Sequence, residues 1–383
     1  MTVKVSKPAI NVREELAELD KPTGIAGEAM LRADTPQEQF NLIGAGRRRL
    51  NINGAFNVWQ RGTSFSSAST LAYHADRYQS YNSNTATGVA TISKSTDAPS
   101  GFGSSYKLEV TTADTSLAIA AEYGLYHYLE GQDLQGIQKG TPDALPLTVS
   151  FWVKSSLTGK FVVELMDNDN SNRHCNKPYY VNSANTWEYK TITFPPDTTG
   201  VFGNDNGNSF HFNFWLGGGT NYSGSSLQEN WGALNQSARA DGQVNVYGTN
   251  GATWQVTGVQ LELGKVATPF EHRSYGEELA LCQRYFEVFE NTASGFRVSG
   301  VAYSTTDTNF ALPFLVEKRA TPTITMTNNG QIYRNAAWRG ATGSSVHGAL
   351  TRGCSISIEE AGNLTAGSAY FIRNYELTVD AEL

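Results

Sequence analysis

The feature that most restricts the fold of this sequence is an alternation of apolar and polar residues that begins after residue 50. In Leu147–Lys154 every second residue is Leu, Val or Phe, and in Phe210–Leu216 three phenylalanines alternate with His, Asn and Trp. Successive side chains of a β-strand point to opposite faces, so this period predicts half-buried antiparallel strands. The chain contains 37 Gly and 12 Pro but only 17% charged residues, a composition that excludes a coiled coil or a long helical bundle.

Further segments have the same strand character and are separated by clusters of turn residues. About eight strands over residues 51–274, with no helical pattern between them, predict a mainly β domain, an antiparallel sandwich of jelly-roll type. The additional strands expected in this domain are Val89–Ser95, Tyr106–Thr112, Phe161–Met166, Trp187–Phe194 and Trp254–Leu263.

The apolar positions change phase within the last of these strands. Trp254 occupies an even position, whereas Val259 and Leu261 occupy odd positions. A slip of one residue predicts a β-bulge at Gly258.

One helical segment and a second group of strands follow the sandwich. Glu277–Phe286 has apolar residues at helical spacing, and Gly276 is the expected cap residue. We expect residues 275–383 to form a separate C-terminal β-domain opened by this short helix. Its strands are expected at Phe296–Tyr303, Phe310–Val316, Thr321–Met326, Ser355–Glu359 and Phe371–Val379.

Residues 1–50 follow a different pattern from the remainder of the chain. They contain eight basic and seven acidic residues, whereas the following 333 residues contain only 21 and 29. A capping box from Asn11 to Glu14 and a second start signal at Asp34-Thr35-Pro36 predict two short helices. Isolated helices of about ten residues are marginal in water, so this head needs a partner surface, from sister chains or from another protein.

Charge, cysteine usage and hydropathy exclude several classes of partner. The formal net charge of -7 provides no broad attraction for nucleic acid or for an anionic membrane. The three cysteines, Cys175, Cys282 and Cys354, are far apart and odd in number, which favours synthesis in a reducing compartment. No apolar run reaches ~18 residues and the first residues lack an apolar leader, so we expect neither membrane insertion nor a signal peptide.

No motif with catalytic or metal-binding spacing is present. HExxH, CxxC, GxSxG and phosphate-binding patterns are all absent, so we expect no cofactor, no metal and no enzymatic activity. Asp167, Asp169 and Ser171 place oxygens at alternate positions, as in a calcium loop, but the required Gly and Glu are missing and a polar hairpin turn is the preferred interpretation. The adjacent residues His174 and Cys175 are expected in an Asn-rich turn, without a catalytic role.

Aromatic residues are more informative about binding. Trp152 and Trp215 lie on the strand faces opposite the aliphatic rows. A tryptophan there either stacks on a sugar ring or packs under a loop or a neighbouring subunit, and packing is the preferred interpretation. Residues 217–251 are rich in Gly, Ser and Asn and form the first candidate for a ligand or partner surface. The predicted binding residues, for a glycan or a partner protein, are Tyr222, Trp231 and Trp338.

Several segments resemble a known family. Asn51–Ser64, with its WQRGT run, and Tyr73–Tyr78, YHADRY, resemble the opening of jelly-roll domains in bacteriophage and prophage structural proteins. Thr257–Tyr275 and Gly276–Tyr285 look like the last strand of the same domains and the helix that opens their C-terminal β-domain. Glu28–Gly44 resembles the virion-attachment region of short tail fibres.

The resemblance implies a structural virion protein, a bacteriophage tail fibre synthesised in the host cytoplasm and located in the virion tail. Such fibres are usually homotrimers. Residues 1–50 would form the adaptor that binds other phage tail proteins, and the β-domains would contact the host surface, with its polysaccharide as a further partner. The motifs suit scaffold roles: Trp59 as a core anchor, and Asp76 with Arg77 as an ion pair that fixes a strand crossing.

Two alternatives stay open at this level. The first is a glycan-binding or glycan-depolymerising tail protein built on the same sandwich. The second is a neck or capsid decoration protein, whose C-terminal domain contacts other virion proteins. The motifs themselves contain no catalytic residue.

Overall fold

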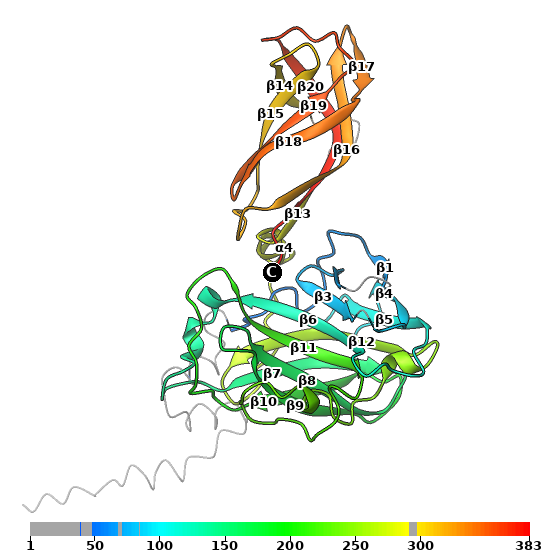
Figure 1. Ribbon diagram of the computed structural model, residues 1–383, viewed down its shortest axis with the longest axis vertical. Coiled ribbons are helices and arrows are strands. Elements are labelled where there is room, and N and C mark those ends of the chain that lie inside the picture. Colours follow the sequence, from blue (N-terminus) through cyan, green and yellow to red (C-terminus); the bar gives the residue numbers. More distant parts are fainter. Residues whose placement is uncertain (1–38, 40–47, 68–70, 84, 291–296) are drawn as a thin grey trace, which may run out of the picture. The chain divides into compact units, whose positions relative to one another are not determined.

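The computed structural model describes residues 39, 48–67, 71–83, 85–290 and 297–383. Of the two short helices predicted before residue 50, only Gln39 of the second lies within these ranges, and the remainder lies outside them. The described chain from Arg49 onwards belongs to one unit, and its regular structure consists mainly of antiparallel strands (Figure 1). The expectation of a mainly β protein is therefore confirmed.

Two six-stranded antiparallel sheets form the first part of this unit, and all seven strands expected there are present. Sheet A has the order β1-β4-β5-β12-β7-β10, and sheet B has the order β2-β3-β6-β11-β8-β9. Sheet A contains β1 (Ser64–Ser66), β4 (Val89–Ser95), β5 (Ser105–Thr112), β7 (Leu147–Ser155), β10 (Glu188–Phe194) and β12 (Thr253–Leu263). Sheet B contains β2 (Leu71–Tyr73), β3 (Tyr78–Asn82), β6 (Glu122–Glu130), β8 (Gly159–Asp167), β9 (Arg173–Val181) and β11 (Asn208–Gly218). Short 3-10 helices occur at η1 (Gly131–Asp133), η2 (Gln135–Ile137), η3 (Gln236–Ala238) and η4 (Val246–Gly248).

Eight consecutive strands pair in a nested order. β5 pairs with β12, β6 with β11, β7 with β10 and β8 with β9, so the first strand meets the last and the middle two form a hairpin. The inner faces of both sheets share one core, in which the rings of Phe151 on β7 and Phe214 on β11 lie 5.0 Å apart. Trp59 belongs to this core and is only 9% exposed, as the anchor role requires.

Strand β9 shows where the sequence interpretation fails. The prediction of an Asn-rich turn at His174 and Cys175 is wrong, because both residues lie inside this strand. Cys175 is part of the core between the sheets, and His174 points to the opposite, outer face. Both faces of β9 are largely buried, so its polarity does not alternate.

Strand β12 contains the bulge predicted from its phase slip. Its register against β7 shifts between Thr257 and Gln260, and Gly258 has φ +62°. A Cβ atom at this glycine would lie 2.6 Å from the ring of Phe102. Glycine is required here both by the backbone conformation and by the close ring.

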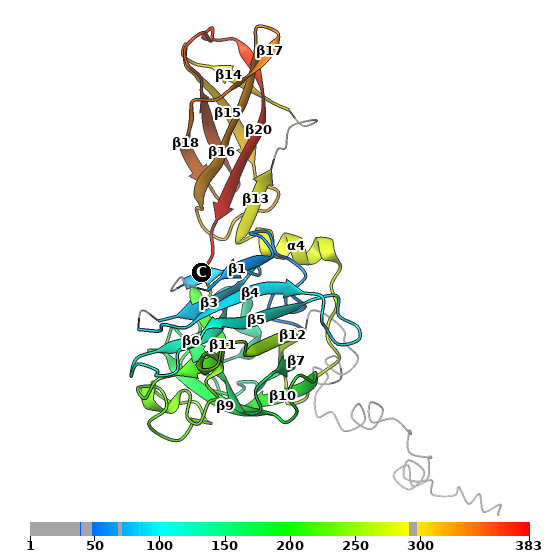
Figure 2. The same ribbon diagram turned by 90° about the vertical axis from the view of Figure 1, so that its right-hand side faces the viewer.

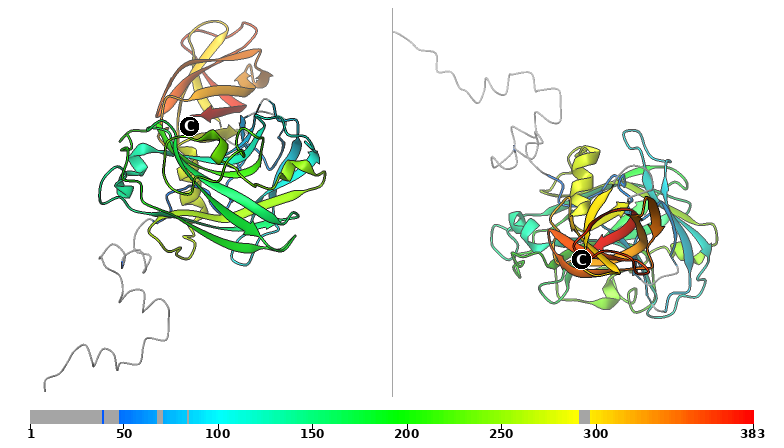
Figure 3. Two further views of the ribbon diagram at one scale, coloured as in Figure 1. Left: turned by 60° about the horizontal axis from the view of Figure 1, so that its bottom comes forward. Right: turned by 90° about the horizontal axis from the view of Figure 1, so that it is seen from above.

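Residues 286–383 build a third antiparallel sheet with a core of its own. Sheet C has the order β17-β16-β20-β14-β15-β19-β18, and β13 also pairs with β20. Its strands curl around a centre when viewed from above in Figure 3. Its members are β13 (Phe286–Glu290), β14 (Val298–Ala302), β15 (Asp307–Pro313), β16 (Thr323–Arg334), β17 (Ala337–Gly340), β18 (Gly343–Leu350), β19 (Gly353–Glu359) and β20 (Ala369–Asp380). Each of the five strands expected in this region has a counterpart.

Helix α4 (Tyr275–Gln283) precedes sheet C (Figure 2). It begins two residues before the predicted start, and its cap is Ser274 rather than Gly276. The Ser274 hydroxyl accepts the backbone N–H of Glu277 at 3.3 Å, and the Glu277 carboxylate accepts the backbone N–H of Ser274 at 2.9 Å. The helix ends before Phe286, which opens β13. No helix in the described ranges has the length and apolar character needed to cross a membrane.

The predicted ion pair between Asp76 and Arg77 is wrong. Asp76 accepts the backbone N–H of Gln60 at 2.7 Å, whereas the Arg77 guanidinium is bound to the carboxylate of Glu382. Adjacent side chains point apart, so each finds a partner from a different segment.

The segment Asn51–Ser64, which resembles the phage family, contacts α4 and β13 and so connects the sandwich to both. The backbone N–H of Asn53 donates to Glu278 of α4 at 2.6 Å, and the Gln60 amide donates to the carbonyl oxygen of Phe286 at 2.7 Å. The Arg61 guanidinium lies 3.5 Å from the centre of the Phe286 ring. These contacts give the motifs a scaffold role at the point where one β region passes into the next.

Candidate binding face on sheet B

The face of sheet B that points away from the core carries a continuous row of polar side chains. Tyr126 on β6 is opposite Asn213 on β11, and Asn213 is opposite Glu164 on β8. Gln79 on β3 and Asn176 on β9 complete the row at its two ends. Such a face is often exposed to water in an antiparallel sandwich, but the side chains of Asn213 and Glu164 are fully buried here.

Residues 219–251, here called the covering loop, bury one half of this face. The loop follows β11 directly, and its Gly232 pairs with the backbone of His174 on β9 at 3.1 and 3.2 Å. From the same loop, Arg239 Nε and Nη2 donate to the two oxygens of Glu164 at 2.8 and 2.7 Å. This bidentate contact fixes the loop to the centre of the sheet.

Glu164 is held as an anion by its surroundings. His174 Nδ1 lies 3.1 Å from one carboxylate oxygen, and Trp215 Nε1 donates to the other at 3.1 Å. The backbone N–H of Asn235 donates to His174 Nε2, so Nε2 is an acceptor and Nδ1 carries the proton that faces Glu164. Burial acts to raise the pKa of Glu164, but Arg239 and then His174 hold that pKa well below its usual range.

The covering loop packs over the Trp215 ring, which therefore has no free face for stacking on a sugar. Its ring is fully buried, with the Tyr222 ring 5.3 Å away and the Arg239 guanidinium 4.9 Å from its centre. The preferred interpretation, packing beneath a loop, agrees with these contacts.

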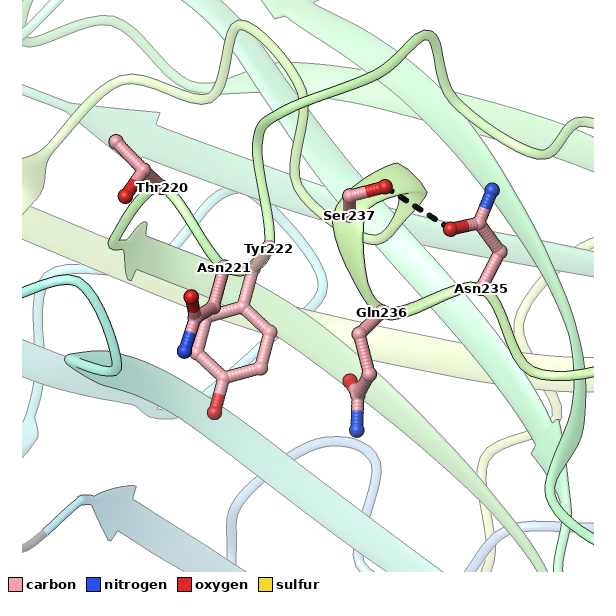
Figure 4. Close-up of a pocket in the computed structure, with 6 residues that line it drawn as sticks. All are labelled: Thr220, Asn221, Tyr222, Asn235, Gln236 and Ser237. Atoms are coloured by element: carbon pink, nitrogen blue, oxygen red, sulfur yellow. Dashed lines mark hydrogen bonds between the residues drawn. The ribbon is translucent and has the colours of Figure 1, made fainter.

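An open pocket lies between two segments of the covering loop (Figure 4). Its volume is about 470 Å³, and it is lined by Thr220, Asn221, Tyr222, Asn235, Gln236 and Ser237. Figure 4 shows Asn221 and Tyr222 on one segment and Gln236 on the other, with the Tyr222 hydroxyl and the Gln236 amide turned to the same side. The Ser237 hydroxyl donates to the Asn235 side chain at 3.0 Å. Amides and hydroxyls both donate and accept, so this lining suits a ligand with many hydroxyl groups.

Tyr222 connects this pocket to the polar row. Its hydroxyl is hydrogen-bonded to Glu122, which also accepts the hydroxyl of Tyr126 and lies 3.7 Å from Arg239. Burial raises the pKa of Glu122, and burial together with the nearby Glu122 carboxylate raises the pKa of Tyr222 to about 12. At neutral pH the Tyr222 hydroxyl therefore keeps its proton.

Aromatic rings continue the face over β3 and β6. Tyr81 and Tyr128 lie on either side of Tyr126, at ring distances of 5.6 and 5.9 Å, and His211 is 5.3 Å from Tyr128. Burial lowers the pKa of His211 to about 4, so the ring is neutral at physiological pH.

Two side chains beneath these rings have unmet hydrogen-bonding capacity. Both ring nitrogens of His211 and both amide atoms of Asn213 are buried and have no hydrogen-bond partner within the described structure. Buried polar groups are normally bonded. These two side chains are exceptions to that rule, and the atoms concerned lie below the solvent-accessible surface.

The structure places the three predicted binding residues in separate environments. Tyr222 lines the pocket. Trp231 packs against the sandwich core, with its indole N–H donating to the carbonyl oxygen of Pro195 at 2.8 Å. Trp338 lies on β17 of sheet C. The sequence interpretation missed Glu164 and Arg239, which are 75 residues apart and carry no local motif.

The acidic turn after β8 is occupied by protein donors. The Asp167 carboxylate is bound to the Lys139 ammonium group, and Asp169 accepts the backbone N–H of Gly203 at 2.8 Å. The segment forms the turn of the β8–β9 hairpin, as predicted. Within the described ranges no group of three or more His, Cys, Asp or Glu side chains is arranged to hold a metal ion.

Comparison with known proteins gives only remote similarity. No protein-family model and no curated protein sequence matches the chain. The chain is similar to the enzymatically active domain of tailspike protein 4 of bacteriophage CBA120, with 11% identity and a TM-score of 0.30, over 56% of this chain and 21% of that one. It is also similar to a family 11 carbohydrate-binding module of Clostridium thermocellum (13% identity, TM-score 0.27, 52% of this chain and 97% of that one) and to the CBM22-1 xylan-binding domain of Paenibacillus barcinonensis Xyn10C (10%, 0.27, 58% and 100%). Likeness at this level assigns no activity, so the candidate face depends on its own geometry.

Proposed function

We propose that this chain is a structural protein of a bacteriophage virion, a tail fibre that binds the tail through residues 1–50 and the host surface through its β-domains. The motifs that resemble phage fibres support this proposal, because the described structure gives them a scaffold role. Asn53, Gln60 and Arg61 bind α4 and β13. The proposal also includes a homotrimer, which would supply partner surfaces for the head.

The fold assignment within this proposal is a jelly roll over residues 51–274 and a second β-domain over residues 275–383. The nested pairing of β5 to β12 supports the jelly roll, because a long hairpin rolled into two sheets pairs its first strand with its last. The separate core of sheet C supports the boundary near residue 275.

For the host contact, we propose that the covering loop and the polar row bind a host-surface glycan. The observation that carries this assignment is the pocket itself, where one tyrosine and several amides and hydroxyls line an open space. Sugar rings present both apolar C–H faces and many hydroxyls, and this lining offers partners for both.

The environments of the Glu164 and Glu122 carboxylates favour glycan binding without cleavage. Glycoside hydrolysis needs a carboxylic acid that can donate a proton near neutral pH. Glu164 is bound by Arg239, and its pKa lies well below the usual range. Burial raises the pKa of Glu122, as a general acid would require, but this carboxylate is buried and already accepts the hydroxyls of Tyr126 and Tyr222. We therefore propose that the protein is no enzyme.

Two experiments test these proposals separately. Antibody labelling of whole phage particles in the electron microscope is expected to place the chain on projecting tail fibres, and label on the capsid or neck would refute the fibre assignment.

For glycan binding, adsorption of the purified full-length protein to host cells is expected to fall in a Gln236→Ala variant and to stay unchanged in Asn250→Ala, an exposed change on the same loop. Equal adsorption of both variants would exclude the pocket.

A further inference from the structure

Sheet C has an aromatic row on its outer face, far from the covering loop in sequence. Trp338 on β17 is opposite Tyr333 on β16, and Tyr333 is opposite Phe371 on β20. The rings of Trp338 and Tyr333 lie 5.1 Å apart. Tyr333 is 39% exposed and Phe371 is 48% exposed, so three adjacent strands present aromatic surface to solvent.

Two arginines lie against this row. The guanidinium of Arg373 is 3.9 Å from the centre of the Trp338 ring, and that of Arg297 is 5.5 Å away. The Arg373 Nε donates to the side-chain oxygen of Gln331 at 3.0 Å, which orients the guanidinium beside the indole. We call Arg297, Tyr333, Trp338, Phe371 and Arg373 the arginine–aromatic patch.

The charge of the patch is not balanced by nearby carboxylates. In the described part of the chain, neither Arg297 nor Arg373 has an Asp or Glu oxygen within ion-pair distance, whereas Arg334 on the neighbouring strand pairs with Glu360 at 2.6 Å. Placing two cations at one indole costs like-charge repulsion that no acidic partner offsets. The whole chain carries a net charge of -7, so the charge of this local surface is opposite in sign to that of the protein.

We propose that the arginine–aromatic patch binds an anionic sugar unit of a host-surface polysaccharide. A guanidinium binds a carboxylate or phosphate through paired N–H groups, and the adjacent rings offer a flat surface to the sugar. This inference rests on the proposed contact with host glycans, but it uses a different surface and adds the charge class of the ligand. A second copy of the chain, whose net charge is -7, is the other acidic occupant that a cationic patch suits, and the sedimentation mass of the variant in the test below separates the two.

Calorimetric titration of the full-length protein tests this assignment. The probes are trigalacturonic acid, glucose 1-phosphate and neutral maltotriose. We expect the patch to bind one or both anionic probes with an affinity that falls as salt increases, and the double variant Arg297→Gln/Arg373→Gln to bind them at least tenfold more weakly. The two anionic probes distinguish a carboxylate from a phosphate as the recognised group. Thermal unfolding of the variant checks that sheet C stays folded.

Two matched variants isolate the patch. Arg339→Gln removes one positive charge from β17, next to Trp338 but opposite the buried Ile332, and this variant should bind the anionic probes like the wild type. Gln236→Ala in the covering loop should also leave this binding intact, so a failure of the loop pocket is distinguishable from a failure of the patch. Unchanged binding by the double variant, no binding by the wild type, or a changed sedimentation mass of the variant would overturn the inference.

Discussion

The guanidinium of Arg77 is bound to the carboxylate of Glu382, although 305 residues separate them in sequence. Their side chains are only 1% and 5% exposed, and the Arg77 guanidinium also lies 3.4 Å from the centre of the Tyr285 ring. A second guanidinium nitrogen donates to the carbonyl oxygen of Tyr128 at 2.6 Å. A loop beside sheet B is thus joined to the segment that follows the last strand.

The substitution Glu382→Gln should destabilise this junction. Removing one partner of a buried ion pair leaves the other charge uncompensated, at a cost of about 3 to 5 kcal/mol. We expect the free energy of unfolding, measured with urea, to fall by that order. The control is Glu317→Gln at the exposed pair with Arg352, which should produce no measurable change. Equal effects of the two substitutions would contradict the role of the buried pair.

Arg239→Met should destabilise the sandwich and release the covering loop. The variant leaves the Glu164 carboxylate buried without its bidentate partner, again at a cost of about 3 to 5 kcal/mol. Hydrogen exchange should increase within residues 219–251 more than in β7 or β12. A loss of stability without increased exchange in the loop would mean that Arg239 does not fix it.

Glu164 also makes stability depend on pH in a defined direction. Its folded pKa lies below the ordinary value of 4.5, so its contribution is fully present above that pH and is lost as the pH falls towards the folded pKa. The stability difference between the wild type and Glu164→Gln should therefore shrink as the pH is lowered below 4.5. Denaturant melts at several acidic pH values measure this difference, and a constant difference would show that Glu164 does not titrate as described.

Two glycine substitutions should have different effects. Gly258→Ala places a Cβ atom 2.6 Å from the Phe102 ring at a φ of +62°, and should cost about 1 to 3 kcal/mol. Gly276→Ala in α4 meets no atom within 4 Å and should be neutral or slightly stabilising, because alanine favours a helix. Thermal unfolding of the two variants is the direct comparison. Similar midpoints would argue against a requirement for glycine at the bulge.

The proposed trimer predicts a specific mass. Sedimentation equilibrium of the purified full-length protein should give the mass of three chains of 41.7 kDa each. If residues 1–50 provide part of the contact between chains, proteolytic removal of the head should weaken association at low concentration. A monomer with a protease-resistant head would contradict the proposal.

Alternation in the sequence was sufficient to predict the strands whose two faces differ. β4, β7 and β12 each have one face in the core and a more polar opposite face, and their bounds lie within a residue or two of the prediction. β6 and β9 were missed because His127 in β6 and Lys177 in β9 interrupt the apolar row on the inner face, so the alternation is broken.

The candidate binding face was only partly predictable for a related reason. The composition of residues 217–251 indicated a functional loop, and Tyr222 does line its pocket. Glu164 lies in a strand whose sequence shows no motif, and its contact with Arg239 forms only after the chain has folded. Long-range ion pairs leave no local pattern, which is also why Asp76 and Arg77 were paired with each other instead of with Gln60 and Glu382.

The nested pairing of the sandwich has a consequence for the order in which the protein can fold. β12 lies in the middle of sheet A, between β5 and β7, yet it is the last strand of the sandwich to be synthesised. Until the chain has been made past Leu263, β5 and β7 each present an open edge to other nascent chains. Assembly of the sandwich therefore has to wait for its final strand, and the period before that strand arrives is when this protein is most exposed to aggregation.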